Sequence, residues 1–143
     1  VDATASAVAY AKKTNKNYPN LSFRLADVLK ENFKENEFGV VISSLFTHHF
    51  DDEAWGLLIK KMLYSSKKAV IINDLHRHPF AYHSIGLLTQ LFSKSPMVKH
   101  DSKLSVLRSF SKKELEILLK KAGAKKYSIK WMWAFRWQVI IWK

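Results

Sequence analysis

The sequence contains no cysteine, few acidic residues (12 Asp and Glu) and only four glycines, which lie far apart at positions 39, 56, 86 and 123. The lack of cysteine excludes disulfide bonds and thiolate metal sites. No apolar run approaches the ~20 residues that span a bilayer, and no signal peptide is visible. We therefore expect a cytoplasmic protein without a membrane partner. The scattered glycines exclude a Gly-rich nucleotide-binding turn among these residues.

The 143 residues are 48% hydrophobic and 13% aromatic, which predicts one globular domain with a core of its own. The net charge of +12 invites a nucleic-acid interpretation. Most lysines, however, are paired on the polar sides or at the ends of predicted helices, where a solvated face explains them. Aromatic and basic residues alternate only in Lys130–Trp137, and strand packing explains those rings more simply than base stacking.

Apolar runs predict the strands. Phe38–Ser43 and Ala69–Asn73 are continuous and bounded by polar residues, which is typical of parallel strands buried on both faces. Leu21–Leu25 alternates and predicts a short strand. The spacing between Lys126–Trp133 and Trp137–Trp142 permits only a hairpin, so the last two strands are predicted to be antiparallel.

Helical spacing and terminal signals predict the helices. One helix is expected from about Asp52 to Ser65, with Leu57, Leu58 and Met62 inward. A second begins at Pro79, runs to about Ser93 and is apolar nearly all round, so we expect it to pack between the sheet and another layer. Ser111 and Glu114 form a capping box for a third helix, with Leu115, Leu118, Leu119 and Ala122 inward, which Gly123 closes. Ser95–Phe110 has few helix signals and is predicted to be irregular.

Alternating strands and helices followed by a hairpin predict an α/β fold: a Rossmann-like, open, mostly parallel sheet with a C-terminal antiparallel hairpin. The pattern shows no internal repeat or linker, so residues 1–143 are interpreted as a single domain. The opening residues Val1–Thr4 are typical of the end of a strand that runs into a helix. We therefore expect the domain to be N-terminally incomplete, with its first β-α unit missing.

Ligands of such sheets bind beyond the carboxyl ends of the strands, which directs attention to Ser43–His49. His48 and His49 are adjacent, so regular structure cannot turn both into one pocket, and each has a structural alternative. His76 and His78 are two residues apart, and a metal site would need a third ligand from Asp74, His100 or Asp101. We expect no metal there and favour a substrate role for this second segment.

The order and spacing of these segments resemble the class I S-adenosylmethionine-dependent methyltransferases of the small-molecule group called methyltransferase type 11. Leu45–Phe50 is similar to the Leu-x-x-His-His-Leu pattern that follows the family's fourth strand. The resemblance implies that Asp2, next to Ala3, holds the ribose hydroxyls of the cofactor. It also implies that Asp27 accepts from the adenine amino group and that Val28 packs on the ring, with Ser43 and Ser44 completing the cofactor site.

The resemblance implies an enzyme that transfers a methyl group from S-adenosyl-L-methionine to a small, aromatic or apolar hydroxylated molecule. His48 and His49 would be catalytic. The expected substrate-binding residues are Asp74, His76, Arg77, His78 and His100. The family's Gly-x-Gly-x-Gly turn is absent, which places the activity of these residues alone in question. Two alternatives stay open: an RNA- or DNA-binding or modifying protein of the same fold, and a non-catalytic remnant. An oligomer also remains open.

Overall fold

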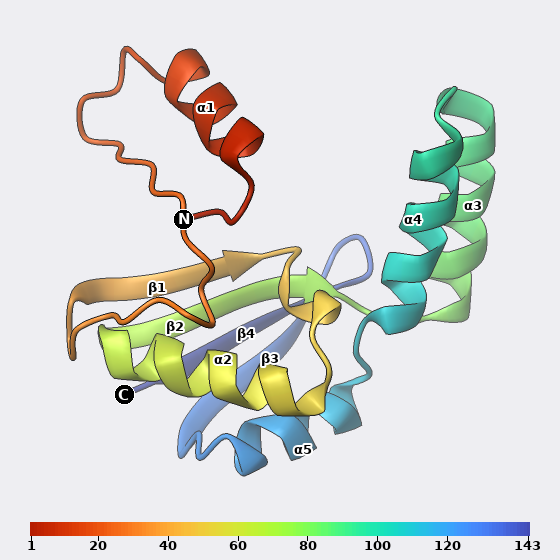
Figure 1. Cartoon of the computed structure of the whole chain (residues 1–143). Coiled ribbons are helices and arrows are strands. Elements are labelled where there is room, and N and C mark those ends of the chain that lie inside the picture. Colours follow the sequence, from red (N-terminus) through yellow and green to blue (C-terminus); the bar gives the residue numbers. More distant parts are fainter.

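The structure, a computed structural model, describes all 143 residues as one four-stranded sheet with five helices (Figure 1). The strands are β1 (Phe38–Ser44), β2 (Ser66–Leu75), β3 (Lys126–Met132) and β4 (Arg136–Trp142). The helices are α1 (Ala5–Thr14), α2 (Asp52–Ser65), α3 (Pro79–Phe92), α4 (Pro96–Arg108) and α5 (Lys112–Lys121), with one 3-10 turn, η1 (Thr47–His49).

The sheet has the strand order β1-β2-β4-β3. β1 and β2 are parallel, whereas β4 lies antiparallel to both β2 and β3. Three strands therefore share one direction and β4 alone is reversed. The predicted fold class, a mostly parallel sheet ending in an antiparallel hairpin, is confirmed.

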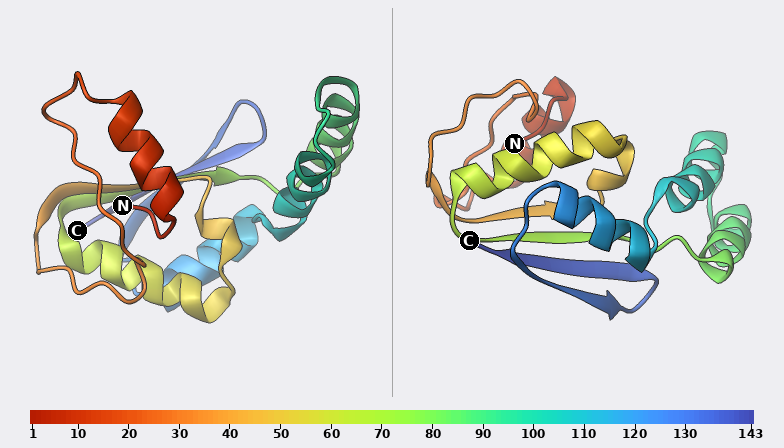
Figure 2. Two further views of the ribbon diagram at one scale, coloured as in Figure 1. Left: turned by 45° about the horizontal axis from the view of Figure 1, so that its top comes forward. Right: turned by 90° about the horizontal axis from the view of Figure 1, so that it is seen from below.

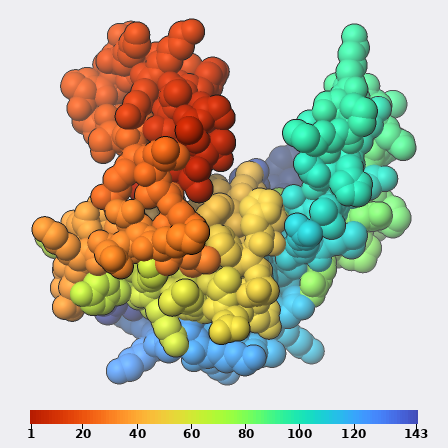
Figure 3. All heavy atoms as spheres, viewed as in Figure 1, coloured from red at the N-terminus to blue at the C-terminus, as the bar shows by residue number.

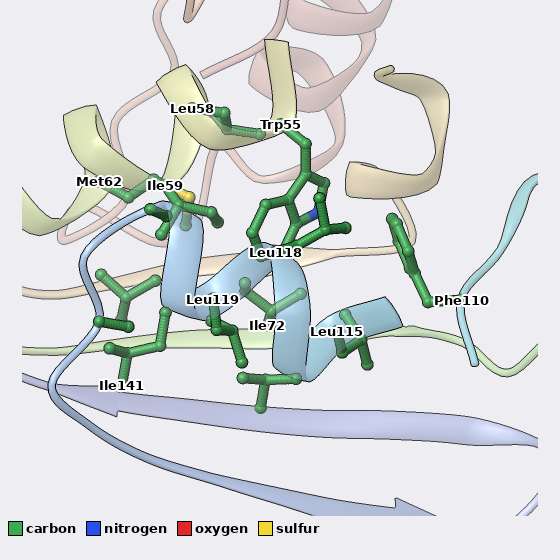
Figure 4. Close-up of a cluster of buried hydrophobic side chains, with 14 of the residues drawn as sticks. Trp55, Leu58, Ile59, Met62, Ile72, Phe110, Leu115, Leu118, Leu119 and Ile141 are labelled. Carbon is green, nitrogen blue, oxygen red and sulfur yellow. The ribbon is translucent and has the colours of Figure 1, made fainter. Parts of the chain in front are cut away.

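The core lies between one face of the sheet and the helices α2 and α5 (Figure 4). Trp55 and Ile59 of α2 and Leu119 of α5 are fully buried against Ile72 and Ile141 of the sheet. Each such side chain contributes about 1.5–3 kcal/mol when it is fully removed from water. The predicted inward residues Leu58, Met62, Leu115, Leu118 and Ala122 are also buried. Leu57, which was expected inward, is exposed because it lies on the opposite side of α2.

β1 is an edge strand and is not buried on both faces, so that prediction is wrong. Ile42 is 67% exposed and Val40 is 41% exposed, while only Val41 packs against the core. A continuous apolar run indicates that burial of the segment is favourable, but it does not determine which other elements pack against it. In the structure β2 is the only strand that pairs with β1.

Two local predictions between the strands are also wrong. Leu21–Leu25 forms no strand, and Leu25 makes only an isolated parallel bridge with Asp2. The predicted irregular connection Ser95–Phe110 contains α4, whose N-cap Ser95 accepts a hydrogen bond from the Val98 N–H at 3.4 Å. Pro96 occupies the first helical turn, where its missing N–H costs nothing. The start signals of this helix were thus present in the sequence.

α3 and α4 pack against each other and form a hairpin that projects away from the sheet (Figures 1 and 2). α3 has the predicted bounds to within one residue, but it lies outside the sheet layers, contrary to expectation. Only Ala81 and Gly86 of α3 are buried. The apolar character of this helix therefore does not come from packing in the core.

Candidate functional site

The candidate site lies at the carboxyl ends of β1 and β2, where the chain leaves β1 and enters η1. Leu45 adopts a left-handed conformation (φ 51°), and its N–H donates to the Asn73 carbonyl of β2 at 2.9 Å. This turn brings Thr47 and His48 next to the end of the neighbouring strand. Both side chains become buried there.

The Asp74 carboxylate is the centre of this arrangement. One oxygen, Oδ2, accepts from the Thr47 N–H (2.7 Å), the Thr47 hydroxyl (2.6 Å) and the His48 N–H (3.2 Å). The other, Oδ1, accepts from His48 Nδ1 at 2.6 Å and from the Leu75 N–H at 2.8 Å. Asp74 is 2% exposed. It was expected to bind substrate, but its lone pairs are already used to anchor η1, so its role is structural positioning.

The hydrogen bonds determine the charge state of this buried carboxyl. Burial by itself would raise the pKa of Asp74, but the hydrogen bonds from His48 and Thr47 favour the ionised form and bring the pKa below its usual value. Asp74 is therefore an anion at neutral pH. With its Nδ1–H held by this anion, a neutral His48 carries its free lone pair on Nε2.

The two adjacent histidines have different surroundings. His48 is buried and fixed to Asp74, whereas His49 is exposed, with its ring centroid 4.2 Å from that of His48. Desolvation lowers the pKa of His49, and the positive charges of His48 and Arg108 add to this, against an opposing effect of Asp74. His49 is thus neutral at pH 7 and open to an incoming molecule. The expectation that only one of the pair can face a pocket agrees with this geometry.

The segment after β2 forms a cluster of rings. His76 lies 4.6 Å from Trp137 and 5.3 Å from His78, measured between ring centroids. His78 caps α3 through its Nδ1, which accepts the Phe80 N–H at 3.2 Å, and its ring stacks on Phe80 and Phe135. Desolvation, with a smaller effect of His78, lowers the pKa of His76.

The other two predicted substrate residues lie outside this cluster. Arg77 forms an ion pair with Glu114 of α5, so its guanidinium is already neutralised. His100 is exposed on α4, in the projecting hairpin. The structure thus brings the rings of His76 and His78 together. The Arg77 side chain is paired with Glu114 instead, and His100 lies on another element, α4. No group of three or more His, Asp or Glu side chains is arranged to hold a metal ion.

Buried polar atoms without partners mark the strand ends. Four such side-chain atoms occur in the chain, and three of them, Ser43 Oγ, Asn73 Oδ1 and His76 Nδ1, belong to the last residues of β1 and β2 or to the residue that follows β2. Orphaned buried polar groups are rare in native structures and require an explanation. The register puts Ser43 on the face of α2 and α5 and Asn73 on the opposite face, so these atoms mark both sides of the strand ends and not one pocket.

A hollow of about 370 Å³ lies beside Asn73, lined by the end of β3, the β3–β4 turn and the start of β4. The strand register places Ser44, Asn73 and Gln138 in one row across the sheet, on the face opposite to α2 and α5. Arg136 and Trp133 form the rim of the hollow. Binding sites for small molecules are typically lined by apolar surface with a few polar side chains, and this face of the sheet has that composition.

Comparison with known proteins identifies the fold. The family model described as "Methyltransferase domain" matches residues 1–69. A SAM-dependent methyltransferase from Aquifex aeolicus superposes with a TM-score of 0.70 at 12% identity, over 98% of this chain and 65% of its own. A putative O-methyltransferase from Nostoc punctiforme gives 0.70 at 16% identity, over 99% and 42%. No curated protein sequence matches.

This chain has the fold of the class I SAM-dependent methyltransferases. Human N-acetylserotonin methyltransferase, whose structure contains SAM, has the same fold with a TM-score of 0.65 at 19% identity, over 99% of this chain and 39% of its own. The chain spans less than two thirds of the length of each of these three structures. The fold that the family resemblance implied is confirmed.

Within this methyltransferase fold, the N-terminal segment brings two of the predicted cofactor residues into one neighbourhood. Asp2 bridges to Leu25: its N–H donates to the Arg24 carbonyl at 3.1 Å, and its own carbonyl accepts from Ala26 at 2.9 Å. Asp27 is the next residue along. Asp2, Ala3 and Asp27 are exposed, and Val28 is half-buried against the core.

Both carboxylates already make local hydrogen bonds. The Asp27 carboxylate accepts from the Leu29 N–H at 3.0 Å, which lowers the pKa of Asp27, and a contact with Lys30 at 3.4 Å adds to this. The Asp2 carboxylate accepts from the Thr4 N–H at 2.7 Å. Because each carboxylate can accept about four hydrogen bonds, both retain capacity for the hydroxyl and amino donors of a nucleoside.

Sequence reasoning missed two residues of the candidate site, Thr47 and Asn73. Thr47 lies between a strand and two histidines, and its place in the sequence gives no sign of a long-range partner. Asn73 interrupts the apolar run of β2, and this signal could have been used, because a polar residue at the end of a buried parallel strand is placed where ligands bind.

Proposed function

We propose that this chain forms part of an S-adenosylmethionine-dependent methyltransferase that acts on a small, aromatic or apolar hydroxylated molecule. The observation that carries the proposal is the η1 turn at the carboxyl ends of β1 and β2, which Asp74 holds in place through Thr47 and His48 and which leaves His49 exposed. The fold supports methyl transfer as the reaction class, because the structures that it resembles are methyltransferases.

The residues present fit the cofactor. Asp2 and Asp27 offer carboxylate oxygens to the ribose and adenine donors, and Val28 offers apolar surface to the adenine. Ser43, whose hydroxyl is buried without a partner, and the neighbouring Ser44 would complete the contacts. When bound, the sulfonium of this cofactor supplies an electrophilic methyl group, and the protein's task is to hold the acceptor in line with it.

His49 is the best candidate for a general base. A hydroxyl acceptor must lose its proton as it attacks, and the base must be unprotonated at the working pH. The lowered pKa of His49 meets this requirement, and its exposure allows contact with a substrate. His48 would position His49 through the anchored η1 turn. Asp74 acts through His48 and is therefore a positioning residue.

The substrate class is inferred from the surroundings of the strand ends. His76, His78, Phe80 and Phe135 present a cluster of rings next to β2, which suits stacking of an aromatic group. The nearby α3 contains no Asp, Glu, Lys or Arg. Such surroundings disfavour a highly charged substrate, because its charge would lie unpaired against apolar surface.

Calorimetric titration of S-adenosylhomocysteine into the full-length protein tests the cofactor assignment. We expect saturable binding that Asp2→Asn and Asp27→Asn each weaken about tenfold, since each loses a charge-assisted hydrogen bond of roughly 1.5 kcal/mol. Asp52→Asn on α2 is the matched control and should bind like the native protein. Absence of binding at millimolar cofactor would refute the proposal.

In an active preparation, His49→Gln should bind the cofactor normally and lose turnover.

Nucleic acid is a second candidate, because one observation favours it. Trp133 is 86% exposed and Trp131 is 49% exposed on the β3–β4 hairpin, beside Lys130 and Arg136. Exposed rings among basic residues suit stacking of single-stranded bases. Such binding would weaken steeply with salt. Fluorescence titration with a short single-stranded RNA at two salt concentrations, using Trp133→Ala for comparison, distinguishes this function from small-molecule methylation.

A further inference from the structure

The α3–α4 hairpin projects from the domain (Figure 3), and many of its apolar side chains are exposed. Phe80, Leu87, Leu88 and Leu91 recur at helical spacing on α3 and are all exposed. The tip adds Phe92 and Met97, which are 82% and 69% exposed. Contiguous apolar patches of this kind are uncommon on soluble proteins and mark interaction sites.

The charged residues nearest the tip are basic, and the first acidic residue, Asp101, follows on α4 after Lys99. No Asp or Glu occurs between Asp74 and Asp101, whereas Lys94 lies at the tip between the two helices and Lys99 and Lys103 follow on α4. Lys103 packs across the hairpin: its side chain passes beside Gly86, and its ammonium lies 5.8 Å from the centre of the Tyr82 ring. The apolar tip therefore carries basic residues and no acidic residue of its own.

The charges decide which occupant fits. A second copy of the chain would bring Lys94 and Lys99 against the same lysines, with no carboxylate at the tip to pair them. An anionic lipid surface supplies both an apolar phase for the leucine and phenylalanine side chains and negative head groups for the lysines. We propose that the tip of the α3–α4 hairpin docks on membranes that contain anionic phospholipids.

The hairpin geometry suits a contact in the membrane interface. Its tip points away from the sheet, to the same side as α1, so the apolar side chains of the tip lie at an outer end of the molecule (Figures 1 and 3). No helix is long and apolar enough to cross a bilayer. The sequence argument against a membrane partner rested on the lack of a spanning segment and of a signal peptide, and interfacial docking requires neither.

Vesicle co-sedimentation with the full chain provides the test. We expect binding to vesicles of phosphatidylglycerol and phosphatidylcholine in equal amounts, and at least tenfold weaker binding to pure phosphatidylcholine vesicles. Raising the ionic strength should weaken the first interaction, because the surface attraction is screened. The double substitution Lys94→Gln and Lys99→Gln should weaken binding about 25-fold, at about fivefold for each lysine.

The apolar contribution is tested at the tip, with controls on α5. Leu91→Ser together with Phe92→Ser should abolish sedimentation with vesicles, because the inserted surface is lost. Ile117→Ser, which removes an exposed apolar side chain from α5, and the pair Lys120→Gln and Lys121→Gln are the matched controls and should bind like the native chain. All these side chains except Lys99 are exposed. Circular dichroism verifies that each variant is folded.

The absence of cysteine allows a direct measurement of insertion. A polarity-sensitive fluorophore attached to Ser93→Cys should brighten several-fold and shift to shorter wavelength with anionic vesicles, while the same label on Ile117→Cys should not. Equal binding to both vesicle types, or binding that survives the tip substitutions, overturns the proposal. Failure to bind vesicles, combined with a dimer that Leu91→Ser and Phe92→Ser dissolve, overturns it in favour of self-association. Binding to an acidic protein but not to vesicles overturns it likewise.

Discussion

At the scale of single residues, Asp74 explains more of the site than either histidine. Its carboxylate joins the end of β2 to the η1 turn through Thr47 and His48. This fixes one histidine inside and leaves His49 outside. The division of roles follows from hydrogen-bond geometry: a carboxylate has enough lone pairs to hold several donors at once, and a buried anion must use them.

Asp74→Ala should therefore be one of the more destabilising substitutions in the chain. It removes the acceptor of the Thr47 hydroxyl, the His48 ring and three backbone N–H groups, at a cost of about 3 kcal/mol. Urea unfolding at pH 7 measures the loss. Asp101→Ala on the surface of α4 is the control and should change the free energy of unfolding by less than about 0.5 kcal/mol. A comparable loss in both variants would contradict the role assigned to Asp74.

The same carboxylate predicts a dependence of stability on pH. Because folding lowers the pKa of Asp74 below its usual value of 3.8, the stabilisation is fully present above that value and is lost as the pH falls through the folded pKa. Folding also lowers the pKa values of His49 and His76 below 6.5. Their protonation therefore begins to reduce the free energy of unfolding as the pH falls below about 6.5, before Asp74 titrates. Below pH 4 the native chain should lose stability more steeply than Asp74→Asn, as measured by thermal unfolding across the acid range.

At the scale of elements, short terminal signals set the helices precisely. Ser111 and Glu114 form the predicted capping box: Ser111 Oγ accepts from the Glu114 N–H at 3.3 Å, and Glu114 Oε2 accepts from the Ser111 N–H at 2.8 Å. Glu114 also pairs with Arg77, which joins α5 to the segment after β2. Gly123, which follows the helix, has a φ of 83°, a backbone conformation that residues other than glycine rarely adopt.

Ser111→Ala should destabilise the chain by about 1 kcal/mol, since the Glu114 N–H loses its side-chain acceptor at the start of α5. Lys113→Ala in the same turn removes no cap and serves as the control. Chemical denaturation of the two variants at pH 7 gives the comparison. If both had equal stability, the capping box would not be contributing.

At the scale of the whole molecule, stability depends on the single core between the sheet and the pair α2 and α5 (Figure 4). The α3–α4 hairpin and α1 lie outside that core, and the hairpin leaves its apolar surface free. The molecule thus consists of a packed domain body and a projecting hairpin, whose exposed apolar composition we explain by a contact with another surface. This arrangement is the basis for the membrane proposal.

Leu119→Ala tests the contribution of the core directly. Leu119 is fully buried between α2 and the sheet, and its truncation should cost about 3 kcal/mol through lost burial and a residual cavity. Ile117→Ala on the same helix is 53% exposed and should cost less than about 1 kcal/mol. Thermal unfolding of both variants measures the difference. Similar losses would mean that the assigned faces of α5 are wrong.

The sequence by itself determined most element types and their order, apart from α4 and the segment Leu21–Leu25, because apolar period, caps and turn residues act over a few neighbouring positions. The fold class, α2, α3, α5 and the terminal hairpin follow from such local patterns. The prediction that the loop after β1 and its two histidines belong to a ligand site also followed from them, and it stays a prediction. The position of Asp27 next to Asp2 depended on the family resemblance.

Tertiary structure alone decided which surfaces are covered. The apolar runs of β1 and α3 have the same composition as fully buried segments, yet much of each is exposed in the structure. The reason is that burial depends on which other elements pack against a segment. The pairing of Asp74 with Thr47 and His48 links residues 26 and 27 positions apart. No local pattern encodes such a contact, because it arises only when β1 and β2 are aligned in register.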